Sequence, residues 1–263
     1  MGRFHHHPDT GDDHDHSHEH DRDVGDHGGY ATRDLRVEVL QEILGENDRT
    51  ADANRDDFRR SGVSAVNVMS SPGAGKTTLL RRVFLELGAT LRAGVVEGDI
   101  ETAHDADLLA ETGVPVSLIN TANGFGGECH LDATMVRSAL PRLPLDELDL
   151  VVIENVGNLV CPAEFDVGED ARAMVFSVTE GEEKPLKYPV MFRTADLVLL
   201  TKVDLLPHLP QIDVAAIEDG LARTMPEPNV IHVSAITDEG MDRWIQWLEA
   251  KRTAALTEVA AKA

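Results

Sequence analysis

The segment Ser70 to Thr78 (SSPGAGKTT) constrains the fold of this chain more than any other stretch. An apolar run, residues 63–69, precedes it and a helix-like run, residues 78–87, follows it. It therefore lies at a strand-to-helix turn, as a phosphate-binding loop requires. Glycines in such a turn let backbone N–H groups surround a phosphate, and the helix N-terminus adds a favourable dipole. The segment predicts a nucleotide site in an α/β domain.

Individual positions of this loop have expected roles. Lys76 is expected to contact the β- and γ-phosphates, and the Thr77 hydroxyl to ligate Mg²⁺. Ser70 stands where the G-x-x-x-x-G-K-[ST] pattern has glycine, but both later glycines are present. The residues predicted to bind the phosphates are Gly73, Ala74, Gly75, Lys76, Thr77 and Thr78.

Short β-branched runs alternate with helix-like runs from residue 63 to the C-terminus. The predicted strands are 63–70, 93–97, 116–119, 148–154, 173–178, 197–201 and 229–233. The predicted helices are 78–87, 104–112, 131–140, 211–224 and 240–255. This alternation indicates an α/β fold of the P-loop NTPase kind, with a mostly parallel sheet and helices on both faces. It breaks at residues 163–185, where the pattern favours an extra edge strand or hairpin.

Two segments precede the predicted domain at residues 63–263. Residues 1–34 mix histidines with acids and have almost no apolar periodicity, so we expect a disordered tail. Imidazole binds Ni²⁺ and Zn²⁺ well, although a solvated tail that binds nothing is the alternative. The candidate nickel ligands of the tail are His5, His6, His7, His14, His16, His18 and His20. In residues 35–62, a helix over 35–44 is predicted, with Gly45 as a candidate end, and the charged residues 46–60 are expected to link it to the domain, either as a linker or as more helix.

Two further predicted strands end in residues that suit phosphate chemistry. Asp99 follows the strand 93–97 and is a candidate for coordinating Mg²⁺ or ordering the attacking water, although it could instead cap the next helix. Glu154 and Gly157 follow an apolar strand with the spacing of the D-x-x-G switch of GTPases, with Glu in place of Asp. Gly157 is expected to offer its N–H to the γ-phosphate. We therefore predict a catalytic set of Lys76, Asp99, Glu154 and Gly157.

The last two strands carry a pattern typical of guanine recognition. Thr201-Lys202-Val203-Asp204 matches [NT]-K-x-D. The Asp204 carboxylate can accept hydrogen bonds from guanine N1–H and N2–H₂, for which adenine has no matching donor pair. Lys202 is expected to lie along the base, and the backbone after Ser234-Ala235 to read guanine O6. These residues predict GTP and GDP as ligands.

Both cysteines of the chain lie in loops near the predicted phosphate site. Cys129 is followed by His130, and Cys161 comes shortly after Gly157. Two thiolates and an imidazole are good ligands for Zn²⁺ or Ni²⁺, whereas two buried, inert thiols are the alternative. The pair is too small for a disulfide framework.

Composition excludes several other classes of protein. The net charge of −23 argues against a nucleic-acid partner, which requires a basic face. No apolar run approaches the roughly 20 residues of a membrane span, and the N-terminus lacks a secretory signal. We therefore expect a cytoplasmic protein with no membrane partner.

Together these motifs resemble the hydrogenase nickel-incorporation GTPases (HypB), of the dimer-forming class of P-loop GTPases. The resemblance rests on SSPGAGKTT, EGDIET at 97–102, CHLDA at 129–133, ENVGNLVCP at 154–162, TKVDLLP at 201–207 and SA at 234–235. It implies a slow GTPase that dimerises when it binds GTP or metal and helps place Ni²⁺ in the [NiFe]-hydrogenase large-subunit precursor. A small zinc-containing HypA-like protein is the implied partner, and Cys129, His130 and Cys161 the implied metal site. A nickel or zinc store with a regulatory GTPase domain, and a GTPase with a structural zinc, are the alternatives.

Overall fold

The computed structural model describes the backbone of residues 30–87, 90–100, 102–122 and 128–262, and the side chains of residues 42–257 within these ranges. The chain divides into two units, Met1–Leu40 and Gln41–Ala263. The predicted disordered tail lies outside the described residues up to residue 29. From Tyr30 the chain is helical.

The N-terminal helix α1 (Tyr30–Arg60) is longer than the sequence predicts. It does not end at Gly45, and the charged residues 46–60 continue it, which is the second of the two possibilities given above. Four residues at spacings of three and four are buried in this half of α1, which makes it an amphipathic helix with one face on the domain. They are Asn47, Ala51, Asn54 and Phe58.

Seven parallel strands form one sheet in the part of the chain that the structure describes. Their bounds are β1 (Ser64–Ser70), β2 (Ala93–Asp99), β3 (Val116–Asn120), β4 (Leu150–Glu154), β5 (Ala171–Ser177), β6 (Leu197–Thr201) and β7 (Val230–Val233). Their spatial order is β3-β2-β4-β1-β5-β6-β7. The predicted α/β fold with a parallel sheet is confirmed.

The prediction of an edge strand or hairpin within residues 163–185 is wrong. Strand β5 lies inside the sheet, where it pairs with β1 on one side and β6 on the other. The connection from β4 to β5 contains a short 3₁₀ helix, Cys161–Ala163, in place of an α-helix. The sequence alternation breaks there because this connection passes from the carboxyl end of β4 to the amino end of β5, as parallel strands require, without an α-helix.

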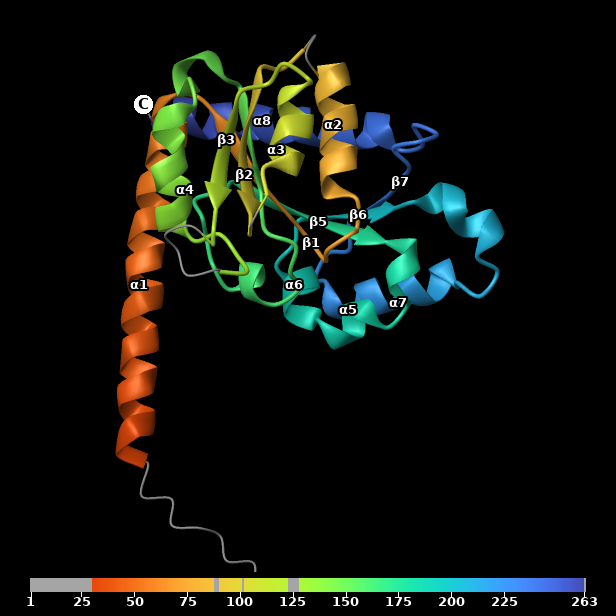
Figure 1. Ribbon diagram of the computed structural model, residues 1–263, viewed down its shortest axis with the longest axis horizontal. Coiled ribbons are helices and arrows are strands. Elements are labelled where there is room, and N and C mark those ends of the chain that lie inside the picture. Colours follow the sequence, from red (N-terminus) through yellow and green to blue (C-terminus); the bar gives the residue numbers. More distant parts are fainter. Residues whose placement is uncertain (1–29, 88–89, 101, 123–127, 263) are drawn as a thin grey trace, which may run out of the picture. The chain divides into compact units, whose positions relative to one another are not determined.

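Helices cover both faces of the sheet (Figure 1). One face packs against α2 (Lys76–Leu87), α3 (His104–Ala110) and α8 (Met241–Lys262). The other packs against α1, α4 (Ala133–Ala139), α6 (Pro189–Arg193) and α7 (Val214–Thr224), with the short α5 (Lys184–Lys187) beside α7. The short helices α5 and α6 were not predicted.

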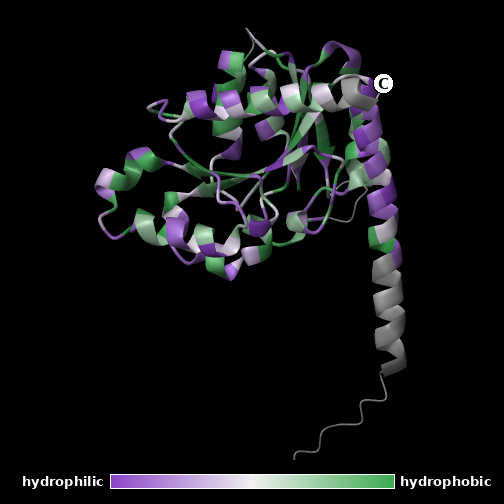
Figure 2. Cartoon of the chain, turned by 180° about the vertical axis from the view of Figure 1, so that it is seen from behind, coloured by the Kyte–Doolittle hydropathy of each residue, from purple (hydrophilic) through white to green (hydrophobic). Residues whose placement is uncertain are grey.

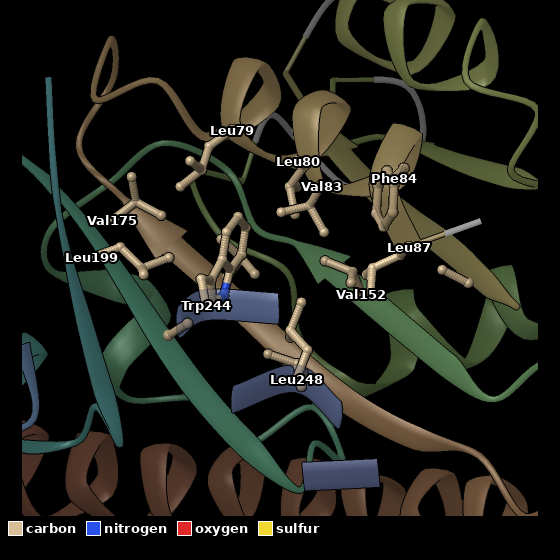
Figure 3. Packing of buried hydrophobic residues seen from close by; sticks show 14 of the residues in the cluster. Leu79, Leu80, Val83, Phe84, Leu87, Val152, Val175, Leu199, Trp244 and Leu248 are labelled. Atoms are coloured by element: carbon tan, nitrogen blue, oxygen red, sulfur yellow. The ribbon is translucent and has the colours of Figure 1, made fainter. Parts of the chain in front are cut away.

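The core explains why these elements hold together. Trp244 and Leu248 of α8 and Phe84 of α2 point at strand residues such as Val152 and Val175 (Figure 3). Hydrophobic residues run along the strands, whereas most helices carry both hydrophobic and hydrophilic residues (Figure 2).

Because all strands are parallel, their carboxyl ends share one edge of the sheet, and the loops that follow the strands lie together there.

Candidate functional site

The loop between β1 and α2 has the backbone that phosphate binding requires. Gly73 and Gly75 have φ angles of +76° and +98°, a region that favours glycine. Ser70, which replaces the first glycine of the usual pattern, holds the lysine: its Oγ lies 3.0 Å from Lys76 Nζ and donates to the Ser71 carbonyl at 2.6 Å. Ser70 therefore positions Lys76 at the mouth of the loop.

A cleft of about 630 Å³ opens above this loop. Gly73 to Thr78 line it together with the other predicted catalytic residues Asp99, Glu154 and Gly157. A Cβ on Gly157 would lie 3.2 Å from the Pro72 Cα, so the loop after β4 rests directly on the phosphate loop. The structure thus brings the predicted phosphate and catalytic residues into one cleft.

Three carboxylates converge at the floor of the cleft. Oxygens of Glu97, Asp105 and Glu154 lie within 4.8 Å of one another, and Glu97 pairs with Glu154 in the register of β2 and β4. Glu97 and Glu154 are each 2% exposed. One oxygen of each has no hydrogen-bond partner among the described residues, while the other Glu154 oxygen accepts from Thr77 Oγ1 at 2.8 Å.

Burial raises the pKa of Glu97 from 4.5 to about 9, and the neighbouring carboxylates of Glu154 and Asp99 add to the rise. Burial also raises the pKa of Glu154, against the lowering effect of Lys76. Carboxylate and hydroxyl oxygens are the ligands that Mg²⁺ prefers, and the unpartnered oxygens fit such an ion. Asp99 lies beside them and accepts from Thr102 Oγ1 at 2.5 Å.

Sequence reasoning missed Glu97 and Asp105. Asp105 reads as an ordinary acid in the first turn of α3. Glu97 carried a usable signal, since a carboxylate inside a strand that is buried on both faces is expensive unless it has a function. Glu154 carries the same signal in the neighbouring strand.

The pKa of Glu97 predicts a pH dependence of stability. Between pH 4.5 and about 9 the folded chain holds a proton on Glu97 that the unfolded chain has lost, so stability falls as pH rises through this window. Without nucleotide or divalent ions, Glu97→Gln should flatten this fall and raise the melting temperature at pH 8, measured by calorimetry. In the wild type, Mg²⁺ binding should release protons. A variant with an unchanged pH profile would contradict the protonated glutamate.

A second pocket, of about 250 Å³, adjoins the phosphate loop. Thr201, Lys202, Asp204 and Ala235 line it, so the two predicted guanine motifs meet. The Thr201 hydroxyl donates to the Ala74 carbonyl at 2.8 Å, and Lys202 Nζ donates to the Gly73 carbonyl at 2.7 Å.

Of the Ser234-Ala235 pair, only Ala235 lines the pocket. Ser234 is fully buried. Its Oγ accepts from the backbone N–H groups of Ile236 and Thr237 at 3.2 and 3.1 Å. Ser234 shapes the loop that presents Ala235.

Cys129, His130 and Cys161 come together as predicted, with ligand atoms within 4.8 Å of one another. The two Sγ atoms are 3.1 Å apart. The His130 ring stacks on Phe165 with centroids 4.1 Å apart, and its buried Nδ1 has no hydrogen-bond partner in the part of the chain described. Burial lowers the pKa of His130 and so favours the neutral imidazole. The adjoining Cys129 thiol raises the pKa of Cys161.

This donor set fits a borderline-soft cation such as Zn²⁺ or Ni²⁺, because two sulfurs and an imidazole nitrogen lie within 4.8 Å of one another. Such an ion would also displace the thiol protons that the close sulfur pair retains. The tail histidines predicted to bind nickel, His5 to His20, lie outside the described residues.

One loop joins the phosphate cleft to the cysteine pair. Asn155 Oδ1 accepts from the Leu131 N–H at 3.0 Å, and Asn158 Nδ2 donates to the Cys129 carbonyl at 3.3 Å. A Cβ on Gly98 would lie 2.8 Å from the Leu131 side chain, so this glycine makes room for the segment after His130. The roles of Asn155, Asn158 and Gly98 cannot be recognised without the fold, because each depends on a contact with a distant segment.

None of the helices in the described ranges is both long enough and apolar enough to cross a bilayer.

Comparison with known proteins gives consistent matches. A family model described as the CobW/HypB/UreG nucleotide-binding domain matches residues 64–231. The chain is 52% identical to the hydrogenase maturation factor HypB of Azotobacter vinelandii over 221 residues, covering 84% of this chain and 71% of that one. For HypB of Escherichia coli K12 the identity is 46% over 232 residues, with 88% and 78% covered. The crystal structure of HypB from Helicobacter pylori in complex with nickel superposes with a TM-score of 0.74 at 33% identity, over 80% of this chain and 96% of that one.

Proposed function

The chain belongs to the CobW/HypB/UreG family and, within it, to the hydrogenase maturation factors HypB, and on this basis we propose that it is a GTP-hydrolysing nickel metallochaperone. In this proposal it helps to insert Ni²⁺ into the [NiFe]-hydrogenase precursor. The observation that carries the proposal is the loop that begins at Glu154, rests on the phosphate loop through Gly157 and ends at Cys161. A single loop can then report the state of the nucleotide to the metal ligands.

Guanine is the base we propose for the second pocket. Asp204 offers an anionic acceptor to the N1–H and N2–H₂ donors of guanine, which adenine lacks. The Ala235 backbone, held by Ser234, supports an N–H contact to guanine O6. The Lys202 stem lies over Gly75, with its Cε 3.8 Å from where a Cβ would be, which supports a place beside the base.

The proposed reaction is transfer of the γ-phosphoryl group from GTP to water. Lys76 and the N–H groups of residues 73–78 would bind the phosphates, and the Gly157 N–H would contact the γ-phosphate. Asp99 would order the attacking water. Thr77, Glu154, Glu97 and Asp105 would hold Mg²⁺, which when bound neutralises negative charge that develops on the phosphates.

The proposed cargo is Ni²⁺ at Cys129, His130 and Cys161. The nickel bound to the Helicobacter pylori relative supports this choice of metal, and the donor set accepts Zn²⁺ equally well. Three ligands from one chain leave a coordination position open, through which the ion could exchange or be shared between two copies in a homodimer. A HypA-like zinc protein is the proposed partner in transfer to the precursor.

A metal store is the second candidate function, and the histidine-rich tail is the feature that favours it. Deleting residues 1–29 should remove most of the Ni²⁺ capacity, because seven of the proposed ligands are lost, and should leave GTP hydrolysis within about two-fold of wild type, a small change in free energy. Equilibrium dialysis with Ni²⁺ and phosphate release measure the two effects.

Full capacity in the shortened chain would show that the tail histidines do not bind nickel. Loss of hydrolysis would show that the tail acts on the nucleotide site. A chain that delivers nickel to the precursor equally well without the tail would place the function in the GTPase domain and not in storage.

A further inference from the structure

The two segments that carry the proposed metal ligands are distant in sequence and meet beneath α1. Asn47 of α1 contacts both of them. Its Oδ1 accepts from the Ala133 N–H at 2.9 Å, and its Nδ2 donates to the Asp166 carbonyl at 2.8 Å. Ala133 lies three residues after His130, and Asp166 five after Cys161.

Asn54, two helical turns further on, makes the same kind of bridge. Its side chain is fully buried, and Nδ2 donates to the carbonyls of Ala133 at 2.8 Å and Val167 at 3.1 Å. Its Oδ1 accepts from Arg137 at 3.1 Å. This region of α1 thus lies beside α4, as Figure 1 also shows. The amide is satisfied only while both segments stay in place.

An ion pair and a close backbone contact reinforce the bridge. Arg55 Nη2 donates to both carboxylate oxygens of Asp166 at 2.8 and 2.6 Å. Gly168 has a φ of +95°, and a Cβ there would lie 2.6 Å from the Asn54 Cβ and 2.7 Å from the Ala51 carbonyl oxygen. No larger residue fits between this segment and α1.

The residues that α1 contacts are next to residues that touch the proposed metal ligands. Phe165, which precedes Asp166, is the residue that stacks on His130. On the opposite side, Arg172 of β5 donates to the carbonyls of Ala163 and Phe165, each at 3.2 Å. The segment with Cys161 is therefore held between α1 and β5, and the contacts of α1 directly adjoin the stack of Phe165 on His130.

We propose that the buried half of α1, residues 47–58, is a strap that positions the Cys129–His130–Cys161 site. Asn47, Asn54 and Arg55 act as positioning residues, which do not touch the metal. The inference rests on the proposed metal site and adds that its affinity depends on the docking of α1. By linkage, metal binding must tighten that docking in return.

Cobalt titration of the full-length chain tests the strap. A thiolate-to-Co²⁺ charge-transfer band reports only thiolate ligands. The chain has no cysteines other than Cys129 and Cys161, so Co²⁺ bound to the tail histidines adds nothing to this band. Asn54→Ala should weaken Co²⁺ binding about 10-fold, the lower end for outer-shell partners, and shift the band. GTP binding should be unchanged. The control Asp48→Ala, which removes an exposed side chain from the same helix, should match the wild type.

Asn47→Asp is the second variant, because it keeps the acceptor for Ala133 but loses the donor to Asp166. If Asn54→Ala loses GTP binding and is therefore misfolded, the Asn47→Asp variant tests the strap in its place. Hydrogen exchange across residues 47–58 should slow on addition of Zn²⁺ in the wild type and less so in this variant. If a folded Asn54→Ala or Asn47→Asp variant has the thiolate-to-Co²⁺ band and the Co²⁺ affinity of the wild type, the strap is refuted and the metal site is unaffected. A wild-type chain without any thiolate band would instead refute the metal site itself, and the strap with it.

Discussion

Asp204→Asn is expected to weaken GTP binding by about 30- to 1000-fold. Asp204 lines the pocket that Ala235 closes, where its carboxylate would accept from both guanine donors. The amide keeps one acceptor and turns a donor towards a guanine donor, so a charge-assisted bond is lost and a polar group is left unpaired, at a cost of about 2 to 4 kcal/mol. Isothermal titration with GTP and GDP measures the change.

A second nucleotide, with xanthine in place of guanine, makes this experiment more specific. Xanthine carries a carbonyl where guanine carries its amino group, so the new amide donor should restore binding of xanthosine triphosphate to the variant. Asp213→Asn is the matched control, because Asp213 caps α7 at the surface and asparagine caps helices equally well. GTP affinity that stays at the wild-type value in Asp204→Asn would remove the guanine assignment.

The sheet could be read from the sequence because each strand is a short apolar run bounded by a motif or a helix. All seven predicted runs overlap β1 to β7. The position of β5 could not be read, since sequence order does not say that the chain returns to the other side of β1. The length of α1 was missed because Gly45 looks like a helix end locally, whereas burial of Asn47, Asn54 and Phe58 keeps the helix going.

The sites divide in the same way. Motif residues such as Lys76, Asp204 and Cys161 can be recognised from the sequence, because their chemistry is tied to a local pattern. Glu97 carries only the signal of a carboxylate inside a buried strand, and Asn155 carries none, since their importance comes from neighbours on other strands and loops: Glu154 for the first and Leu131 for the second. The strap on α1 is further from any motif, and only the fold brings it to the metal ligands.

Nucleotide and metal are expected to be coupled through the loop from Glu154 to Cys161. A γ-phosphate that draws in the Gly157 N–H must move a loop that already touches Pro72. The hydrogen bond from the Asn158 side chain to the Cys129 backbone carbonyl would pass this movement to Cys129. GDP has no γ-phosphate and leaves the loop where it is. Cys129→Ala and Cys161→Ala should each abolish the coupling and leave GTP binding near the wild-type value, because neither cysteine lines the phosphate cleft or the base pocket.

The most direct test of the metallochaperone account is the affinity for Ni²⁺ and Zn²⁺ of the chain without residues 1–29, measured by competition with a chelating dye. The GDP form is compared with the form that holds a non-hydrolysable GTP analogue and Mg²⁺. The account predicts that metal affinity differs between the two forms by roughly 5- to 150-fold, the range of typical allosteric coupling, with the same factor for nucleotide affinity with and without metal. Equal metal affinity in both nucleotide forms would contradict it and would leave a GTPase with a structural zinc.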